Sequence, residues 1–293
     1  MKPRHLLTLI ACLAFAVWLP AQEPIPASTQ ERLATSDLLN TLTQKDIVDI
    51  SSKANSGDEK AQYWLALINS EGRLIPKNQD AAREWMLRSA QQGYAAAQEG
   101  MGGIYLSAEG IHTRDNSEAQ RWFGLAATQG YAEAQFWLGT GYEQGWFGQK
   151  DYDQALRWLR EAAQQGLPNA QFCLGQMYED GEGVSASEVI AAQWYRKAAD
   201  HVPSYLGGVF DAVIQLVYMY RDGRLPRDDV DAYMWFAIVG SWSDPPSDEE
   251  ITEISRRMTQ AEIVEAQRRA EDWIKRLTFQ QQSVQAAVAK EKP

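Results

Sequence analysis

The sequence predicts an all-α protein in which about five two-helix units stack side by side into a solenoid. An Ala-Gln pair recurs every 36 or 37 residues, at Ala61-Gln62, Ala97-Gln98, Ala134-Gln135 and Ala170-Gln171. In the second half of each unit a Trp recurs with an Ala three positions before it, at Trp85, Trp122, Trp158, Trp194 and Trp235. No part of the 293-residue chain shows the apolar and polar alternation that is typical of a strand.

The first 21 residues have the layout of an export signal. Lys2 and Arg4 precede an uninterrupted run of apolar, small or neutral residues at positions 6–19, and Ala21 precedes a polar stretch. This run is too short to cross a bilayer, which needs roughly 20 residues. We therefore expect residues 1–21 to be a signal peptide cleaved after Ala21. The mature protein is then periplasmic or secreted, without a membrane span.

Two alternatives to cleavage after Ala21 remain open. Positions 9–12 match a bacterial lipoprotein box with Cys12 as the lipid acceptor, although the apolar run continues beyond Cys12 to Leu19. The segment is also compatible with an uncleaved short anchor. If Cys12 leaves with the signal, Cys173 is the one remaining cysteine, and the mature chain forms no internal disulfide.

A linker and a helical cap are predicted before the first repeat. Residues 22–45 are rich in Pro, Ser, Thr and Gln, which is typical of a linker, with one short helix near its end. Beyond it, Ile47, Ile50 and Ala54 lie on one side of a predicted helix. This helix is expected to be half a unit that covers the first repeat, so the solenoid should occupy residues 46–246.

Each repeat is predicted to be two short helices joined by a glycine turn. Seven residues before each Trp stands a side chain that can cap a helix start, namely Asn78, Asp115, Asp151, Ser187 or Asp228. Small residues flank each Trp one turn to either side, except that Val239 follows Trp235, so a neighbouring helix can receive the indole. Because a single hairpin cannot bury both of its faces, the units must stack, and all five indoles are expected to be enclosed.

The end of the repeat region is less regular. Val202-Pro203 replaces the glycine that ends the second helix of the first three units, and an insertion follows it. Two capping-box patterns predict further helix starts, Ser247 with Glu250 and Thr259 with Glu262. We expect residues 247–278 to form a polar-faced C-terminal cap and residues 279–293 to form a mobile tail.

Charge narrows the class of partner. Lys and Arg number 28 against 39 Asp and Glu, which gives a formal charge of −11 and an isoelectric point near 4.9. Such a surface repels a phosphate backbone, so no nucleic-acid partner is expected. The hydrophobic fraction of 45% is that of a folded protein and excludes a disordered chain.

No recognised catalytic or metal-binding motif is present in the sequence. His112 and His201 are the two histidines after the signal, and both fall in predicted loops with no Cys or carboxylate at a metal-binding spacing. We therefore predict a protein that is not an enzyme and that binds no cofactor or metal. The alternative is a hydrolase of cell-wall material that uses the carboxylates Glu143, Glu179 and Glu182.

Aromatic residues outside the Trp column are the candidates for binding a protein partner. Trp146 and Phe147 stand together in a turn, where two large rings are hard to bury. The insertion offers Tyr205 and Phe210, either in an apolar loop or in an extended helix. First-helix rings either line a concave wall or pack against the next unit, and these are Tyr63, Trp64, Phe136 and Trp137.

Several motifs together resemble the Sel-one-like repeat (SLR) family, a branch of the tetratricopeptide-like αα-hairpins. They are Ala-Gln-x-x-Leu-Gly at 134–139 and 170–175, Asp-Gly-x-Gly-Val at 180–184 and Ala-x-x-Trp-Tyr-x-x-Ala-Ala at 191–199. The resemblance covers residues 57–240 and implies a right-handed superhelix that acts as an adaptor in multiprotein assemblies, including those of exported bacterial envelope proteins. The chain departs from the cysteine-rich secreted members, which staple each repeat with a disulfide.

These observations together predict a non-catalytic scaffold of the bacterial cell envelope whose partner is another protein. Besides the hydrolase, a lipid-anchored subunit of a polysaccharide export assembly remains as an alternative function, with Cys12 as the lipid site.

Overall fold

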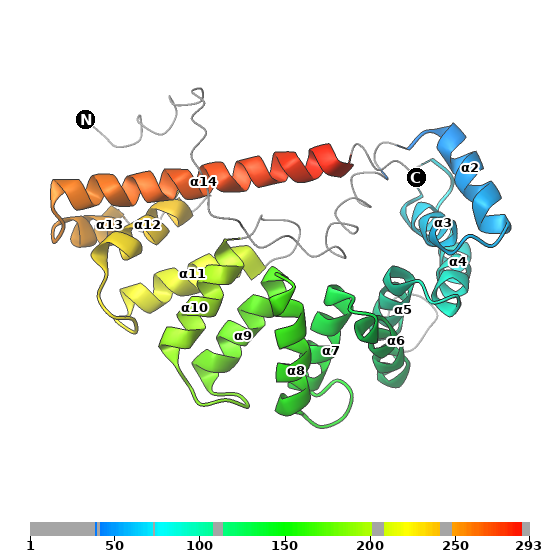
Figure 1. Ribbon diagram of the computed structural model, residues 1–293, viewed down its shortest axis with the longest axis horizontal. Coiled ribbons are helices and arrows are strands. Elements are labelled where there is room, and N and C mark those ends of the chain that lie inside the picture. The colour runs from blue at the N-terminus through cyan, green and yellow to red at the C-terminus, as the bar shows by residue number, and fades with distance from the viewer. Residues whose placement is uncertain are drawn as a thin grey trace.

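A computed structural model describes Leu39 and residues 42–72, 74–107, 114–200, 208–240 and 248–288. Every regular element in these ranges is a helix, and the helices follow one another along a curved arc (Figure 1). This confirms the predicted all-α solenoid. The predicted export signal, with Cys12, lies outside the described residues, as do most of the linker, His112, His201 and Tyr205.

Five helix pairs form the repeats, with a capping helix before them and two helices after them. The cap is α2 (Gln44–Asn55). The pairs are α3 (Glu59–Glu71) with α4 (Gln79–Gln91), α5 (Ala95–Leu106) with α6 (Asn116–Thr128), α7 (Ala132–Gln144) with α8 (Tyr152–Gln164), α9 (Pro168–Asp180) with α10 (Glu188–Ala199), and α11 (Gly208–Arg221) with α12 (Asp229–Gly240). The chain ends with α13 (Asp248–Ser255) and α14 (Gln260–Val288).

The predicted capping column starts the second helix of every pair. The side chains of Asn78, Asp115, Asp151, Ser187 and Asp228 each accept a hydrogen bond from a backbone N–H in the first turn. The first helices α3, α7 and α9 end at Gly72, Gly145 and Gly181, whose φ values of 72°, 72° and 74° lie in the left-handed region that glycine adopts without strain. Local sequence therefore sets both ends of the turns after α3, α7 and α9.

The Trp column is only partly enclosed. Trp122, Trp158 and Trp235 are buried, whereas Trp85 and Trp194 are half-buried, so the expectation of five enclosed indoles is wrong for these two. The Arg88 guanidinium lies 4.6 Å from the centre of the Trp85 ring, and the Lys197 ammonium lies 4.4 Å from that of Trp194. These two indoles lie at the edge of the core under a cation.

The residue after each Trp is the centre of the core instead. These residues are Met86, Phe123, Leu159, Tyr195 and Phe236, all buried. In three units this side chain packs against a glycine of the first helix, where an added Cβ would overlap it, with Gly102 facing Phe123, Gly139 facing Leu159 and Gly175 facing Tyr195. Large and small residues thus alternate across the hairpin and allow close packing.

The C-terminal helices cover the last repeat. Thr259 and Glu262 form the predicted capping box at the start of α14, while Ser247 lies outside the described residues. Trp273 of α14 is buried, with its ring centre 6.1 Å from that of Trp235. The helix continues to Val288, beyond the boundary predicted at residue 278. Figure 1 shows α14 extending from α12 across the open side of the arc.

Candidate functional site

The Gln of each Ala-Gln pair joins one unit to the next. The side-chain amides of Gln62, Gln98, Gln135 and Gln171 donate to the carbonyl oxygens of Ala54, Ala90, Ala127 and Ala163 at 3.1–3.2 Å. Their own oxygens accept, in the first three cases, from Gln92, Gln129 and Gln165 at 2.7 Å. We call these seven residues the glutamine ladder. The glutamines of the four Ala-Gln pairs are buried, whereas Gln92 and Gln129 are exposed and Gln165 is half-buried. Gln135 also donates to the Glu161 carboxylate at 3.2 Å. The ladder extends from α2 to α9, so the Ala-Gln pairs are structural.

The ladder stops at Gln171. Its side-chain oxygen is buried and has no hydrogen-bond partner among the described residues. The position that would supply the donor, seven residues after Trp194, is His201 in the sequence. Beyond this point the apolar core continues, and the polar contacts between units are made mainly by charged groups.

Two groups of ion pairs join the last units, and we call them together the ion-pair end. Arg224 contacts Glu179 at 2.6 Å and Glu188 at 2.7 Å, and the Tyr195 hydroxyl donates to Glu179 at 2.5 Å. The second group centres on Asp231, which contacts Arg196 at 2.9 Å and Arg269 at 3.4 Å. The second group connects α10, α12 and α14.

Three predicted binding residues come together in the middle unit. The ring of Trp137 lies 5.2 Å from that of Phe136 and 6.4 Å from that of Trp146, and it stacks on the buried ring of Phe123 at 6.2 Å. Phe136, Trp137 and Trp146 are half-buried. We call these three residues the aromatic cluster. Its rings are held in place by packing but remain in part open to a partner.

The turn after α7 holds Trp146 in a fixed position. The backbone N–H of Trp146 donates to the Gly141 carbonyl at 2.8 Å. The backbone carbonyl of Trp146 accepts from the Asn116 side chain at 2.5 Å. Phe147 packs over Gly141, where a side chain would overlap its ring, and edge-on against Tyr142 at 5.6 Å. Phe147 therefore serves to fold the turn, whereas Trp146 is presented by it.

The other predicted binding residues do not join this cluster. Tyr63 and Trp64 are buried, so they pack between units. This was one of the two alternatives predicted for the first-helix rings. Phe210 is 41% exposed at the start of α11. Tyr205 lies outside the described residues.

The carboxylates of the hydrolase alternative have structural partners or are buried. Glu179 contacts Arg224, and Glu182 accepts a hydrogen bond from the Tyr152 hydroxyl at 2.8 Å. Glu143 is buried, and burial together with the charge of Glu182 raises its pKa above the usual range. In the described part of the chain, no three His, Cys, Asp or Glu side chains are arranged to hold a metal ion.

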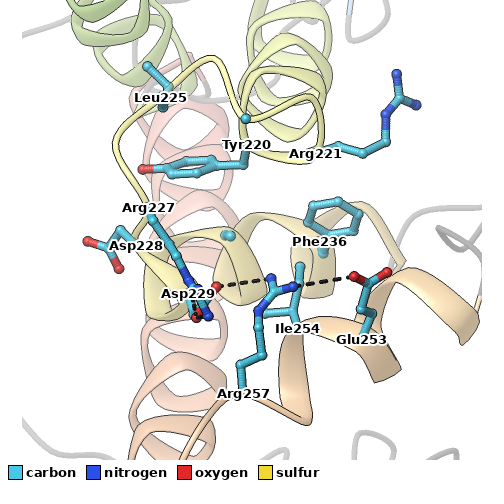
Figure 2. A pocket seen from close by; sticks show the side chains of 12 residues that line it. Tyr220, Arg221, Leu225, Arg227, Asp228, Asp229, Phe236, Glu253, Ile254 and Arg257 are labelled. Atoms are coloured by element: carbon cyan, nitrogen blue, oxygen red, sulfur yellow. Dashed lines mark hydrogen bonds and ion pairs between the residues drawn. The ribbon is translucent and has the colours of Figure 1, made fainter.

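A cleft of about 470 Å³ at the end of the solenoid was not predicted from the sequence. Figure 2 shows the Tyr220 ring on one side and Arg227, Asp229, Arg257 and Glu253 on the other. Asp229 contacts Arg227 at 2.9 Å and Arg257 at 3.1 Å. Burial alone would raise the pKa of Asp229, but the hydrogen bonds from the two arginines outweigh it and lower this pKa. The lining residues come from α11, α12 and α13, from the turn between α11 and α12, and from Arg257 just after α13, which no single motif brings together.

The fold and these contacts define a solenoid of αα-hairpin repeats whose units are held together by side-chain hydrogen bonds and ion pairs. A family model described as Sel1 repeat matches residues 59–94, 95–131, 132–167, 168–201 and 208–238. The chain therefore belongs to the Sel1 repeat family, as the sequence motifs indicated. Sel1 repeats form a scaffold fold that mediates protein–protein interactions.

Solved structures share this fold. A Sel1 repeat protein from Oxalobacter formigenes is 25% identical with a TM-score of 0.60, over 83% of this chain and 68% of that one. The protective antigen c5321 of uropathogenic Escherichia coli is 24% identical with a TM-score of 0.46, over 90% and 64%. The immunity protein Pa5087 of Pseudomonas aeruginosa is 17% identical with a TM-score of 0.44, over 85% and 88%. No curated protein sequence matches this chain.

None of the helices in the described ranges combines the length and the apolar character that crossing a bilayer requires.

Proposed function

We propose that this protein is a non-catalytic scaffold that holds a protein partner in the bacterial cell envelope, after export to the periplasm or secretion. Its family supports the scaffold role, since Sel1 repeats mediate protein–protein interactions. The layout of residues 1–21, with a basic start and a short apolar run, supports export. The acidic net charge of −11 favours a partner with a basic surface over a nucleic acid.

The observation that carries this proposal is the aromatic cluster. Large rings that pack on the core and remain partly open are the usual anchors of protein interfaces, because they bury much apolar area with little loss of conformational freedom. Phe136, Trp137 and Trp146 have this character, and the hydrogen bond from Asn116 fixes the turn that carries Trp146. The partner therefore buries Trp146 and the open edge of Trp137.

The experiment compares two Trp variants in living cells. The chain carries a photo-activated cross-linker near the cluster, at the exposed Gln149, in the native background and in Trp146→Ala and Trp194→Ala. Trp194 is the matched control, because it is also half-buried but lies in α10 outside the cluster. We expect a cross-linked partner for the native chain and for Trp194→Ala, and its loss for Trp146→Ala. Equal capture by all three proteins would overturn the assignment of this surface.

Mass spectrometry of the mature amino terminus tests the location. Cleavage after Ala21 gives a chain that begins at Gln22, which supports an exported protein without an anchor. A lipidated Cys12 would instead favour the anchored export subunit, and an intact Met1 in the cytoplasm would contradict export.

A further inference from the structure

In three units a contact joins the start of the second helix to the turn of the following unit. Asn116, the first residue of α6, donates to the Trp146 carbonyl in the next turn. Tyr152, the first residue of α8, donates to Glu182 at 2.8 Å. Glu188, the first residue of α10, accepts from Arg224 at 2.7 Å. In these three units the first residue of the second helix thus contacts the turn of the following unit.

Where the turn after α9 contacts α8, this turn supplies three kinds of group. Gly183 lies so close to α8 that an added Cβ would be 2.6 Å from the Cβ of Tyr152. Val184 packs against the core that includes Leu156. Glu182 provides the polar contact to Tyr152. The contact with α8 therefore combines a close glycine backbone, an aliphatic side chain and a polar or charged group. In the turns that reach α6 and α10, an added Cβ at Gly148 or Gly223 would meet no atom within 4 Å, so there the polar contact is the shared feature.

The last repeat receives only two of these three groups. The short helix α13 places Ile254 in the core and brings Arg257 to Asp229, the first residue of α12. Residues 241–259, between α12 and α14, contain no glycine, so this segment places no glycine turn here. The cleft of about 470 Å³ occupies this position, between the Tyr220 ring and the ion pairs of Asp229 (Figure 2).

The cleft has an apolar interior and a charged rim. Leu225, Ala232, Phe236 and Ile254 line it and are themselves buried in the core. At the rim, the side chains of Arg227 and Glu253 are 66% and 72% exposed. An aliphatic side chain can therefore enter between charged groups that are still in contact with water.

We propose that this cleft binds a loop of the protein partner that contains a glycine turn followed by an aliphatic residue. The argument is one of continuity, since the cleft stands at the position where α6, α8 and α10 each receive the following turn, and the turn that reaches α8 carries this glycine and aliphatic pair. An acidic residue before the glycine pairs with Arg227, because Arg227 is the most exposed of the three arginines that line the cleft. This inference rests on the proposed function in one respect, namely that the ligand is a protein.

A peptide with the sequence of residues 179–185, which contains the chain's own turn, serves as the probe. Its binding to the mature chain is measured by fluorescence anisotropy, beside a control peptide in which both glycines are replaced by Val. We expect saturable binding of the glycine peptide with a Kd below about 1 mM, and binding of the control peptide at least about tenfold weaker.

Two variants locate the site. Arg227→Glu reverses the rim charge, and Glu253→Trp places a ring over the entrance without altering the buried lining. Arg256→Glu is the matched control, because Arg256 is exposed just after α13 and does not line the cleft. We expect both cleft variants to weaken peptide binding by about tenfold and the control to leave it unchanged, with helical spectra and melting temperatures that show folded protein throughout.

Failure of this inference differs from failure of the proposed function. If the native chain does not bind the glycine peptide, or if all variants bind it equally, the cleft is not such a site, whatever the cross-linking shows. If the peptide binds as expected but no cross-linked partner is found in cells, the cleft proposal stands and the proposal for the aromatic cluster falls.

Discussion

The units from α2 to α9 and those from α9 to α14 are joined by different chemistry. In the first region the glutamine ladder connects neutral side chains with backbone carbonyls, and Gln135 and Gln171 are 2% and 0% exposed. In the second region the ion-pair end depends on Arg224 and Asp231, whose side chains are 28% and 20% exposed. Both regions carry the same repeat, so the backbone fold requires neither the glutamine ladder nor the ion pairs.

The difference indicates where the molecule resists changes in its surroundings. Buried amide hydrogen bonds are insensitive to salt, and each leaves an unpaired group in the core when it breaks. Partly exposed ion pairs are weaker and are screened by salt. The ladder region therefore acts as a rigid support for the aromatic cluster, whereas the ion-pair end, which adjoins the cleft, adjusts to solution conditions.

Removal of a core ring should have the largest effect. Phe123→Ala in α6 should lower the free energy of unfolding by about 3–5 kcal/mol, because Phe123 is fully buried beside Gly102 and Trp137. Urea denaturation followed by circular dichroism measures it. Leu125→Ala, two residues away and 41% exposed, is the control and should change stability by less than about 0.5 kcal/mol. Similar losses for both variants would mean that the core is not where we place it.

Interruption of the ladder should have the next largest effect. Gln98→Met keeps the length of the side chain but removes the donor to Ala90 and the acceptor for Gln129. We expect a loss of about 1–3 kcal/mol that is the same at low and high salt. Gln164→Met, at an exposed position of α8, is the control. A loss that shrinks with added salt would show that the ladder does not act through buried neutral groups.

The ion-pair end should respond less, and in a salt-dependent way. Arg224→Met removes the contacts to Glu179 and Glu188 and should cost about 1 kcal/mol at low ionic strength. At about 1 M NaCl the native chain should lose most of this advantage, because the Debye length falls to about 3 Å. Denaturation curves at both salt concentrations measure the difference. A cost that is independent of salt would remove the distinction between the two regions.

The smallest effect concerns Glu143 at the end of α7, in the ladder region. Burial and the charge of Glu182 raise its pKa in the folded chain, so folding favours the protonated form. That stabilisation is complete below the unfolded pKa and is lost as the pH rises through the folded pKa. Glu143→Gln should therefore raise the melting temperature relative to the native chain at pH 7 but not at pH 4. A gain at pH 4 that equals the gain at pH 7 would exclude titration as the cause.

The repeat was predictable because its signals are local. The capping residues, the glycine turns and the period of 36 or 37 residues depend on neighbours in the sequence, and the structure confirms them at Asn78 and Asp151. The burial of Trp85 and Trp194 was overestimated. Residues that follow one another on a helix point about 100° apart, and the next residue faces the glycine of the partner helix.

The contacts between units were harder to predict. The sequence marked Gln135 as recurrent, but its hydrogen bonds to Ala127 and Gln165 depend on how the helices are placed. Because Phe147 stands in a turn, the sequence predicted that its ring is exposed. The space next to Gly141 that holds this ring forms only when the turn folds. The cleft combines residues of three helices, and nothing in the spacing of Tyr220, Asp229 and Arg257 predicts their meeting.

Hydrogen exchange at low and high salt tests the contrast between the two regions most directly. With about 0.05 M and about 1 M NaCl, we expect equal protection of the amides of α4, α6 and α8 in both conditions. The amides of α12 and α14 should exchange faster at high salt, because local opening there breaks screened ion pairs. Equal changes in both regions, or a loss of protection confined to α4, α6 and α8, would contradict this account.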